Sequence, residues 1–222
     1  MKKRYLRAVL FFLGIVGIIA YVLFPSERKV ECIEKELNFY SYVDSTSGVQ
    51  TAEIKPPAFK CILSKEGGHC GIGFSFKETD NWNLMDFLVI DMQSSADFKE
   101  LIVQILTIDS HTKEYDRSTM KPLIKELKLE PNKKRYSIPM EHFYTPDYWY
   151  EQQKVKENHN AKRFSNVAGM DIYSGWKNKT NKPLELKIES VCLEGVNNTR
   201  FVILVIYICI LIATAISVRV RN

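Results

Sequence analysis

The sequence predicts a mainly β protein, in which a β-sandwich domain is flanked by two transmembrane α-helices. The helices are predicted because an uncharged apolar run lies near each end of the chain, at 8–24 and at 201–218. The sandwich is predicted because several short apolar segments of strand length lie between these runs, at 25–200, where helical periodicity is weak. About eight short strands in one domain are typical of a β-sandwich.

Composition excludes a disordered chain and argues against nucleic-acid binding. Of the 222 residues, 45% are apolar and 12% are aromatic, which is too many for a disordered chain. The formal net charge of +5 belongs to the two tails, which hold Lys2, Lys3, Arg4, Arg7, Arg219 and Arg221. Without those residues the acidic side chains slightly outnumber the basic ones, so the body of the protein has no basic excess with which to bind a nucleic acid.

Each apolar run is nearly long enough to span a bilayer. The first has 17 residues and the second has 18. At about 1.5 Å per residue they reach a hydrocarbon core of ~30 Å with the help of snorkelling basic side chains. The first run is an alternative candidate for a cleaved signal peptide, but it is long for that role and no small-residue cleavage site follows it. The second is an alternative candidate for a buried core element, which so long an uncharged run disfavours.

The positive tails predict the topology. Basic residues flanking membrane helices remain in the cytoplasm, so both termini are expected there. The predicted order is a cytoplasmic tail (1–7), a helix (8–24), an extracytoplasmic domain (25–200), a helix (201–218) and a cytoplasmic tail (219–222). We therefore expect a two-pass protein of the cell inner membrane whose main domain is periplasmic or extracellular. A signal passing inward would then need a separate membrane or cytoplasmic signalling protein.

The cysteines fit an oxidising compartment. Four of the five lie in the outer region, namely Cys32, Cys61, Cys70 and Cys192, whereas Cys209 lies in the second apolar run. Four cysteines allow three connectivities, and the sequence does not choose among them. The simplest pairing joins Cys61 to Cys70 across a Gly-rich turn, and Cys32 to Cys192 at the two ends of the domain. A zinc site is disfavoured because there is no Cys-x-x-Cys motif, and disulfides are typical of such a compartment.

Apolar patterning places the strands of the outer domain. We expect a hairpin of 61–63 with 71–76, followed by strands at 84–92, 100–109, 135–140, 167–173 and 184–193. The last of these alternates, with Leu184, Leu186, Ile188 and Cys192 on one side. One or two helical turns are expected at 146–156, within a charged and aromatic surface loop at 145–165.

One segment resembles a known group of proteins. The run from Tyr136 to Trp149 reads Tyr-Ser-Ile-Pro-Met-Glu-His-Phe-Tyr-Thr-Pro-Asp-Tyr-Trp. It resembles a Tyr-x-Ile-Pro segment, followed by Phe, Pro and Trp, of galactose-binding-like jelly rolls. These occur as carbohydrate-binding modules and as extracytoplasmic sensor domains of bacterial membrane signalling proteins. The resemblance covers roughly 32–194 and implies a jelly-roll sandwich with a carbohydrate-like ligand.

The same resemblance bears on cofactors. Many jelly rolls of this type hold a structural Ca²⁺ through carboxylates near the first and last strands, and the resemblance implies Glu34, Glu36 and Glu189 as the corresponding carboxylates here. The sequence predicts no other cofactor and no catalytic metal.

Catalytic motifs are absent from the sequence. It contains no Gly-x-Ser-x-Gly, His-Glu-x-x-His, Walker A or Gly-x-Gly-x-x-Gly pattern, and its four histidines have no metal-ligand spacing. Asp86 and Asp91 could imitate the acid pair of a glycosidase, but that mechanism depends on a separation that sequence does not give. We therefore expect no enzyme, with a glycan-active hydrolase as the least favoured alternative.

Aromatic and polar side chains give the candidate binding residues. Sugars present apolar C–H faces and polar rims, which suit aromatic rings with neighbouring amides or carboxylates. The predicted ligand-binding residues are Asp147, Tyr148 and Trp149 in one group and Asn81, Trp82 and Asp86 in another. An ordinary structural interpretation also exists, in which Trp82 and Trp176 fill the ends of the core while Asn81 and Asp86 serve turns.

Two functions follow from these features. The first is a membrane-anchored extracytoplasmic sensor or binding module that recognises a carbohydrate-like ligand and acts through a separate partner protein. The alternative is a structural or accessory subunit of an envelope membrane complex. Small residues that permit close helix packing, including self-association, are Gly14, Gly17, Ala213 and Ala215.

Overall fold

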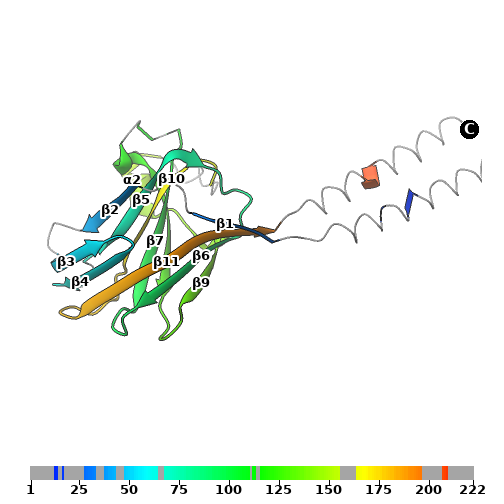
Figure 1. Cartoon of the computed structure of the whole chain (residues 1–222). Helices are drawn as coiled ribbons and strands as arrows, with labels where there is room; N and C mark the ends of the chain where they lie inside the picture. Colours follow the sequence, from blue (N-terminus) through cyan, green and yellow to red (C-terminus); the bar gives the residue numbers. More distant parts are fainter. Residues whose placement is uncertain are drawn as a thin grey trace, which may run out of the picture. The chain divides into compact units, whose positions relative to one another are not determined.

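The computed structural model of the chain describes residues 13–14, 17, 28–33, 38–43, 48–64, 68–110, 112–113, 116–155, 164–196 and 207–209. The chain divides into two compact units, of which one is Val30–Glu194 and the other combines the two terminal segments. The first unit contains the sandwich (Figure 1), and the prediction of a mainly β domain with two sheets is confirmed.

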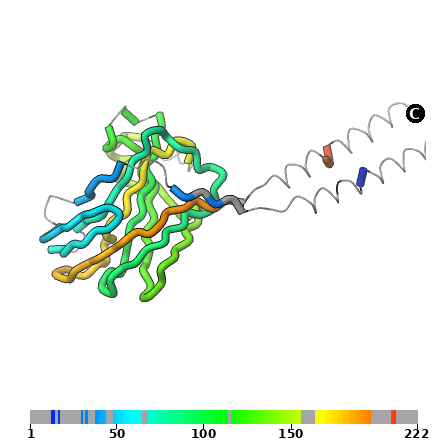
Figure 2. Tube along the Cα trace, viewed as in Figure 1, coloured from blue at the N-terminus to red at the C-terminus, as the bar shows by residue number. Residues whose placement is uncertain are grey.

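Two sheets form the sandwich. Sheet A consists of β1 (Arg28–Cys32), β3 (Val49–Lys55), β4 (Ala58–Leu63), β6 (Phe87–Ser94), β9 (Arg135–Pro139) and β11 (Pro183–Val196). Its order is β3-β4-β11-β6-β9, with β1 also paired to β11. Sheet B consists of β2 (Asn38–Val43), β5 (Cys70–Asp80), β7 (Glu100–Thr107), β8 (Lys121–Lys128) and β10 (Val167–Ser174), in the order β2-β5-β10-β7-β8. Figure 2 shows β11, in orange, running beside the green β6, although the two are far apart in sequence.

The core lies between the sheets because alternate side chains of each strand point inward. On β7, for example, Leu101, Val103 and Ile105 belong to the main buried cluster, whereas Ile102 belongs to a separate cluster on the other face. The helical elements of the described sandwich are short: η1 (Arg117–Thr119), η2 (Met140–His142) and α2 (Asp147–Gln153). The helix α2 falls where one or two turns were predicted.

The apolar strands were predicted closely, but four strands were missed. β6, β7, β9, β10 and β11 begin and end within a few residues of the predicted ranges. The missed strands are β1, β2, β3 and β8. Three of these, β2, β3 and β8, lie at sheet edges, where polar side chains face solvent and weaken the apolar signal. β8 also contains a proline at position 122, which an edge strand tolerates.

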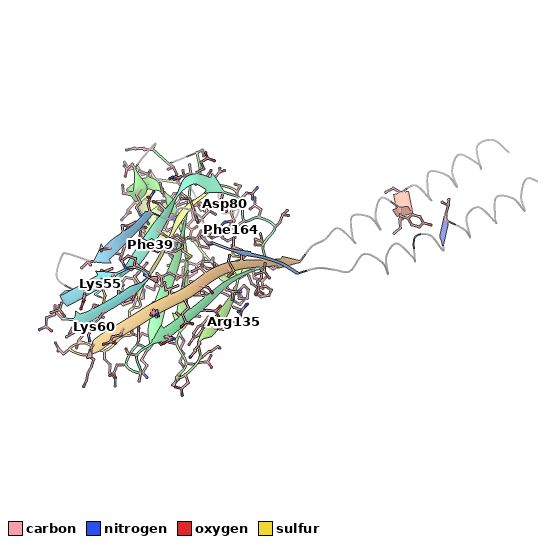
Figure 3. The ribbon with its side chains drawn as sticks, in the orientation of Figure 1. Phe39, Lys55, Lys60, Asp80, Arg135 and Phe164 are labelled. Carbon is pink, nitrogen blue, oxygen red and sulfur yellow. A yellow bond between two sulfur atoms is a disulfide. The ribbon has the colours of Figure 1, made fainter. Side chains whose placement is uncertain are left out.

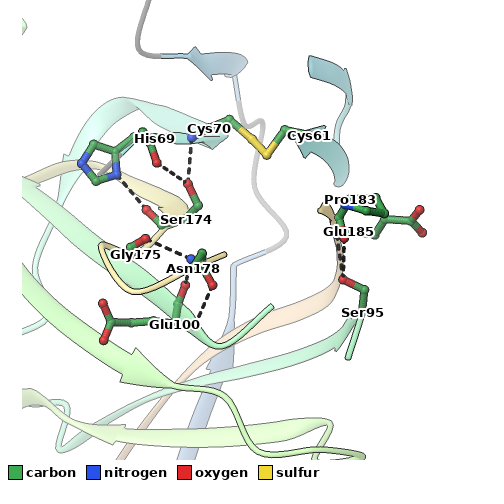
Figure 4. Close-up of a disulfide and its surroundings, with 11 residues drawn as sticks. Cys61, His69, Cys70, Ser95, Glu100, Ser174, Gly175, Asn178, Pro183 and Glu185 are labelled. Atoms are coloured by element: carbon green, nitrogen blue, oxygen red, sulfur yellow. Dashed lines mark hydrogen bonds between the residues drawn. A yellow bond between two sulfur atoms is a disulfide. The ribbon is translucent and has the colours of Figure 1, made fainter. Parts of the chain in front are cut away.

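The predicted hairpin of 61–63 with 71–76 is wrong. β4 belongs to sheet A and β5 to sheet B, so the chain crosses from one sheet to the other between them. Cys61 and Cys70 are both buried in the main core and form a disulfide, which therefore ties the two sheets together (Figure 4). The two short apolar segments do not pair with each other, because each belongs to a different sheet and points its apolar side chains into the core between the sheets.

The second disulfide joins Cys32 to Cys192, as predicted, but Cys192 does not share the face of Leu184. The register of β11 against β6 shifts between Ile188 and Ser190. Such a bulge inserts one extra residue and reverses the alternation beyond it. Leu193 therefore packs into the core, and Cys192 is free to bond β1.

The predicted membrane spans 8–24 and 201–218 lie almost entirely outside the described residues. Within the described part of the chain, no helix is both long and apolar enough to cross a membrane. Leu13, Gly14 and Gly17 are helical, as is 207–209. A Cβ atom on Gly17 would collide with the ring of Tyr207, so the two terminal segments touch at this point.

Candidate functional site

Two rows of side chains cross the outer face of sheet B. The first row contains Tyr40, Gly73, Asp171, Gln104 and Ile124, and Tyr144 extends it through an isolated bridge to Ile124. The second row contains Tyr42, Gly71, Tyr173, Ile102 and Glu126. The intervening residues Ile72, Val103 and Ile172 point into the core, so both rows face away from it. We define the tyrosine face as Tyr40, Tyr42, Gln104, Glu126, Tyr144, Asp171 and Tyr173.

Alternate glycines on β5 make this arrangement possible. A Cβ atom on Gly73 would collide with the Tyr40 ring and the Asp171 carboxylate. A Cβ atom on Gly71 would collide with the backbone of β10. Because these positions carry no side chain, the tyrosines of β2 reach across β5 to the side chains of β10. The Gly-x-Gly pattern in a strand is the signal in the sequence that could have indicated this site.

Asp171 is fully buried at the centre of the first row. It accepts hydrogen bonds from the Tyr40 hydroxyl and from Gln104 Nε2, at 3.1 Å for the latter. Arg117 Nη2 bonds both carboxylate oxygens, at 2.7 and 2.8 Å. Burial raises the pKa of Asp171 to about 6, although the charge and hydrogen bonds of Arg117 and the bond from Gln104 lower it. The carboxyl group is therefore held by three partners at a site that penalises its charge.

Arg117 reaches this carboxylate from η1. Its guanidinium carbon lies 4.2 Å from the centre of the Tyr40 ring, within range of a cation–π interaction. Asp116 caps η1 by accepting hydrogen bonds from the backbone N–H of Ser118, at 3.0 Å, and from its hydroxyl, at 2.6 Å. Only Nη2 of the guanidinium bonds Asp171, and the side chain is 38% exposed. The remaining N–H groups point to no described acceptor.

The tyrosines of the two rows supply aromatic rings and hydroxyl donors. The rings of Tyr42 and Tyr173 are stacked, with centroids 4.7 Å apart and planes at 21°. The Tyr173 hydroxyl donates to Gln104 Oε1 at 3.2 Å, and burial raises its pKa. Tyr144 donates to Glu126 at 2.6 Å, and burial together with that bond raises the pKa of Tyr144 to about 12. These phenols therefore stay protonated and act as hydrogen-bond donors.

Exposure on this face increases from the floor to the rim. Asp171 and Tyr173 are buried, together with Ile102 and Ile124. Half-buried or exposed groups surround this floor, namely Tyr40, Tyr42, Gln104, Arg117, Glu126 and Tyr144. The face thus presents aromatic rings, amide and hydroxyl groups and one guanidinium on a sheet scaffold.

The first predicted group lies on α2 and is split by the structure. Trp149 is 2% exposed, and its indole N–H has no hydrogen-bond partner among the described residues. Lys121 Nζ lies 5.9 Å from the centre of its ring. Asp147 and Tyr148 are exposed. Tyr148 is thus on the surface, whereas the Trp149 side chain is buried in the protein.

The second predicted group lies at the far end of β5. Trp82 is 1% exposed and donates from Nε1 to Asp80 at 3.2 Å. The Asn81 side chain accepts a hydrogen bond from the backbone of Asn83 at 3.1 Å, and Asp86 is exposed. Asp80 pairs with Val167, several residues along β5 from Gly71 and Gly73. The structure therefore gives Trp82 and Asn81 the core and turn roles of the structural interpretation and does not bring this group to the tyrosine face.

The third tryptophan contradicts the prediction of a core role. Trp176 is 51% exposed and contacts the ring of His69, with centroids 4.2 Å apart. The structural interpretation gave Trp176 and Trp82 the same core role, and no pattern in the sequence distinguishes the two.

The outer face of sheet A is charged rather than aromatic. Lys55 pairs with Glu53 at 2.7 Å and Lys60 with Glu185 at 2.6 Å, and Figure 3 labels both lysines. A groove of about 420 Å³ crosses β3, β4, β11 and β6 between these pairs. Exposed pairs of this kind contribute little free energy, and nothing in the groove selects a ligand.

The described residues contain no metal-binding cluster, and Asp91 is bonded by neighbouring side chains. No group of three or more His, Cys, Asp or Glu side chains that could hold a metal ion occurs among them. Glu189 accepts a hydrogen bond from Gln93, and Glu34 and Glu36 lie outside the described residues. Asp91 is bonded by Ser190 at 2.8 Å and by Arg135 at 3.3 Å. The carboxylate of Asp91 thus has structural partners.

Comparisons with known proteins agree with the architecture. No protein-family model matches the chain, and neither does any curated protein. Among solved structures, the chain is similar to the family 11 carbohydrate-binding module of the cellulosomal cellulase Lic26A-Cel5E of Clostridium thermocellum. The match has 15% identity and a TM-score of 0.50, and it covers 78% of this chain and 96% of that one. A family 11 module from the same organism in complex with a β-1,3-1,4-mixed-linked tetrasaccharide matches with 14% identity and a TM-score of 0.51, covering 75% and 95%.

These likenesses show the fold. The domain is a β-sandwich of the jelly-roll type found in carbohydrate-binding modules, as the resemblance of the 136–149 segment implied. Both matched structures are carbohydrate-binding modules, and the prediction that this chain is not an enzyme stays a prediction.

Proposed function

We propose that the chain is a carbohydrate-binding protein and that its ligand contacts the tyrosine face. The observation that carries this proposal is the pair of cross-strand rows, which place Tyr40, Tyr42, Gln104 and Tyr144 at the rim of one sheet surface. Aromatic rings pack against the apolar faces of sugars, and neutral amide and hydroxyl groups match sugar hydroxyls. A sheet scaffold holds these groups in place before the ligand arrives, which lowers the cost of binding.

The first probe is a mixed-linked β-1,3-1,4-glucan, because one structurally similar module was solved with such a tetrasaccharide. Xylan and unrelated soluble polysaccharides complete the panel. Binding is measured by calorimetry with the full chain in detergent micelles. Binding of at least one glycan is expected, and a folded chain that binds none would remove the proposed ligand class.

A variant of Tyr42 tests the location of the site. Tyr42→Ala is expected to weaken binding by about tenfold or more, because a ring is lost from the face, whereas Tyr42→Phe retains most of the affinity. Phe39→Ala is the matched control, since Phe39 is also an exposed aromatic on β2 but points to the other face and packs against Phe74. Thermal unfolding of each variant reports on its folding. Equal losses in Tyr42→Ala and Phe39→Ala would place the site elsewhere.

We further propose that the segments 8–24 and 201–218 anchor the sandwich in a membrane, with 25–200 outside and both termini in the cytoplasm. Support comes from the apolar runs, the basic tails and two disulfides in the outer region. External protease added to intact cells should degrade the sandwich but spare tags at both termini. Loss of both tags under the same conditions would contradict this topology.

Anchoring leaves two ways for the module to act. In the sensor function, glycan occupancy is passed through the terminal segments to a separate signalling protein. In the accessory-subunit function, the partner contact is constant. The free, exposed Cys209 provides a crosslinking site that separates them. A crosslinking pattern that changes when glycan is added supports the sensor function, and a pattern that is the same with and without glycan supports the accessory-subunit function.

A further inference from the structure

Trp176 lies in the turn between β10 and β11. Of the three tryptophans in the sequence, all of which the structure describes, it alone is exposed. A single exposed apolar side chain is common in soluble domains and does not by itself indicate a site. The contacts beneath this ring distinguish it.

Four aromatic side chains form a continuous series that leads from the tyrosine face to Trp176. Tyr42 stacks on Tyr173, and the Tyr173 ring lies 5.2 Å from that of His69 at 78°. The His69 ring in turn lies 4.2 Å from Trp176 at 82°. The imidazole therefore sits between two aromatic rings that are both steeply inclined to it, and Trp176 continues the aromatic surface beyond the end of β10.

His69, which contacts Trp176, is held in place by a network of hydrogen bonds; Figure 4 shows His69 with its neighbours Ser174 and Cys70. His69 is buried, and its Nδ1 lies 2.8 Å from the carbonyl oxygen of Ser174. The Ser174 hydroxyl accepts from the Cys70 backbone N–H at 3.0 Å and donates to the Gly68 carbonyl at 3.1 Å. Cys70 is itself fixed by its disulfide to Cys61.

The other end of the turn is equally constrained. Asn178 is 2% exposed and accepts hydrogen bonds from the backbone N–H groups of Lys99 and Glu100, at 2.8 and 3.1 Å. Its amide donates to the carbonyls of Glu100 and Gly175, at 2.7 and 3.0 Å. A turn fixed at both ends presents its indole with little conformational entropy left to lose on binding.

We propose that Trp176 forms a further ligand subsite, so that a bound glycan chain runs along β10, from Asp171 and Arg117 past Tyr173 to Trp176. This inference rests on the proposed carbohydrate-binding function. Asp171 and Tyr173 face outward at alternate positions of β10, about 7 Å apart along the strand, and Trp176 lies in the turn just beyond Ser174, where β10 ends. The competing course crosses the strands along the first row, from Tyr40 toward Tyr144. The two courses predict that different variants, at Trp176 or at Tyr144, lose affinity as the oligosaccharide becomes longer.

The test compares oligosaccharides of increasing length, from the disaccharide upward, cut from mixed-linked β-glucan or from whichever panel polysaccharide the wild-type chain binds. Trp176→Ala, Trp176→Phe and Tyr144→Ala are titrated as full chains in detergent. Leu84→Ala is the control for removing an exposed apolar side chain, since Leu84 is 84% exposed in a turn distant along the chain from these residues.

Trp176→Ala is expected to lose about tenfold in affinity for the longest oligosaccharide and to bind the disaccharide as the wild type does. Trp176→Phe should recover most of the loss, and Leu84→Ala should show none. If Tyr144→Ala shows the length-dependent loss while Trp176→Ala does not, the ligand crosses the strands and the inference is overturned. Unchanged affinity of Trp176→Ala at every length also overturns it. A wild-type chain that binds no glycan overturns the proposed function together with this inference, which separates the two kinds of failure.

Discussion

Asp171 shows how one buried residue organises a surface. It is 131 residues from Tyr40 and 54 from Arg117 in sequence, yet both bond its carboxylate. A buried carboxylate is tolerated only when it is well bonded, because desolvation penalises its charge. The raised pKa of about 6 indicates that burial outweighs the help from Arg117 and Gln104. The residue is therefore bound by several partners and still costly to keep ionised.

This balance predicts a pH dependence of stability. Because the pKa of Asp171 rises from 3.8 to about 6 on folding, its contribution is fully present below pH 3.8 and is lost as the pH rises through about 6. The difference amounts to about 3 kcal/mol, at ~1.4 kcal/mol per pKa unit. Between pH 4 and pH 7 the wild-type chain should therefore lose more unfolding free energy than Asp171→Asn, as measured by chemical denaturation. Parallel pH profiles for the two chains would show that Asp171 does not titrate in this range.

At the scale of single elements, β5 and β11 show that an apolar pattern predicts where a strand lies in the sequence better than it predicts the strand's sheet or the direction of its side chains. The apolar residues of β5 were recognised, but not its sheet, because alternation does not reveal which layer a strand joins. In β11 a single bulge reversed the side of Cys192 relative to Leu184. Trp176 and Trp82 illustrate the same limit for side chains, since their burial depends on neighbours that come from other strands.

The outward-facing glycines of β5 provide a prediction at this scale. Gly73→Ala places a methyl group against the Tyr40 ring and the Asp171 carboxylate, so it is expected to destabilise the fold by about 1–3 kcal/mol and to weaken glycan binding. Gly14→Ala is the control, because nothing lies within 4 Å of a Cβ atom there. Both are measured by thermal unfolding and calorimetry. A Gly73→Ala chain with wild-type stability and affinity would mean that the tyrosines do not need to cross β5.

At the scale of the whole molecule, the two disulfides have different roles. Cys61–Cys70 joins the two layers inside the core, over a separation of 9 residues. Cys32–Cys192 closes a separation of 160 residues and ties the first strand of the sandwich to its last. The second bond therefore holds the two ends of the sandwich domain together.

Removing the long-range bond should therefore be costly. Cys32→Ala/Cys192→Ala is expected to lose up to about 5 kcal/mol of unfolding free energy, because the unfolded chain regains the entropy that the closed loop had removed. The comparison is made by chemical denaturation under oxidising conditions. Reductant should lower the stability of the wild-type chain further than that of the double variant. Equal sensitivity to reductant in both chains would mean that this bond does not form in solution.

Local patterns in the amino-acid order were enough to predict a mainly β sandwich and the short helix near Trp149, whereas the two disulfides followed only from choosing the simplest of three pairings. The strands and the helix are indicated by alternation, spacing and composition, which can be read from residues that are close together in the sequence. Folding alone decided that Trp149 is buried and Trp176 exposed, that Cys192 faces β1, and that Tyr40, Arg117 and Asp171 meet on one surface. Burial and register are set by contacts between strands distant in sequence, and a linear pattern carries no record of which strands become neighbours.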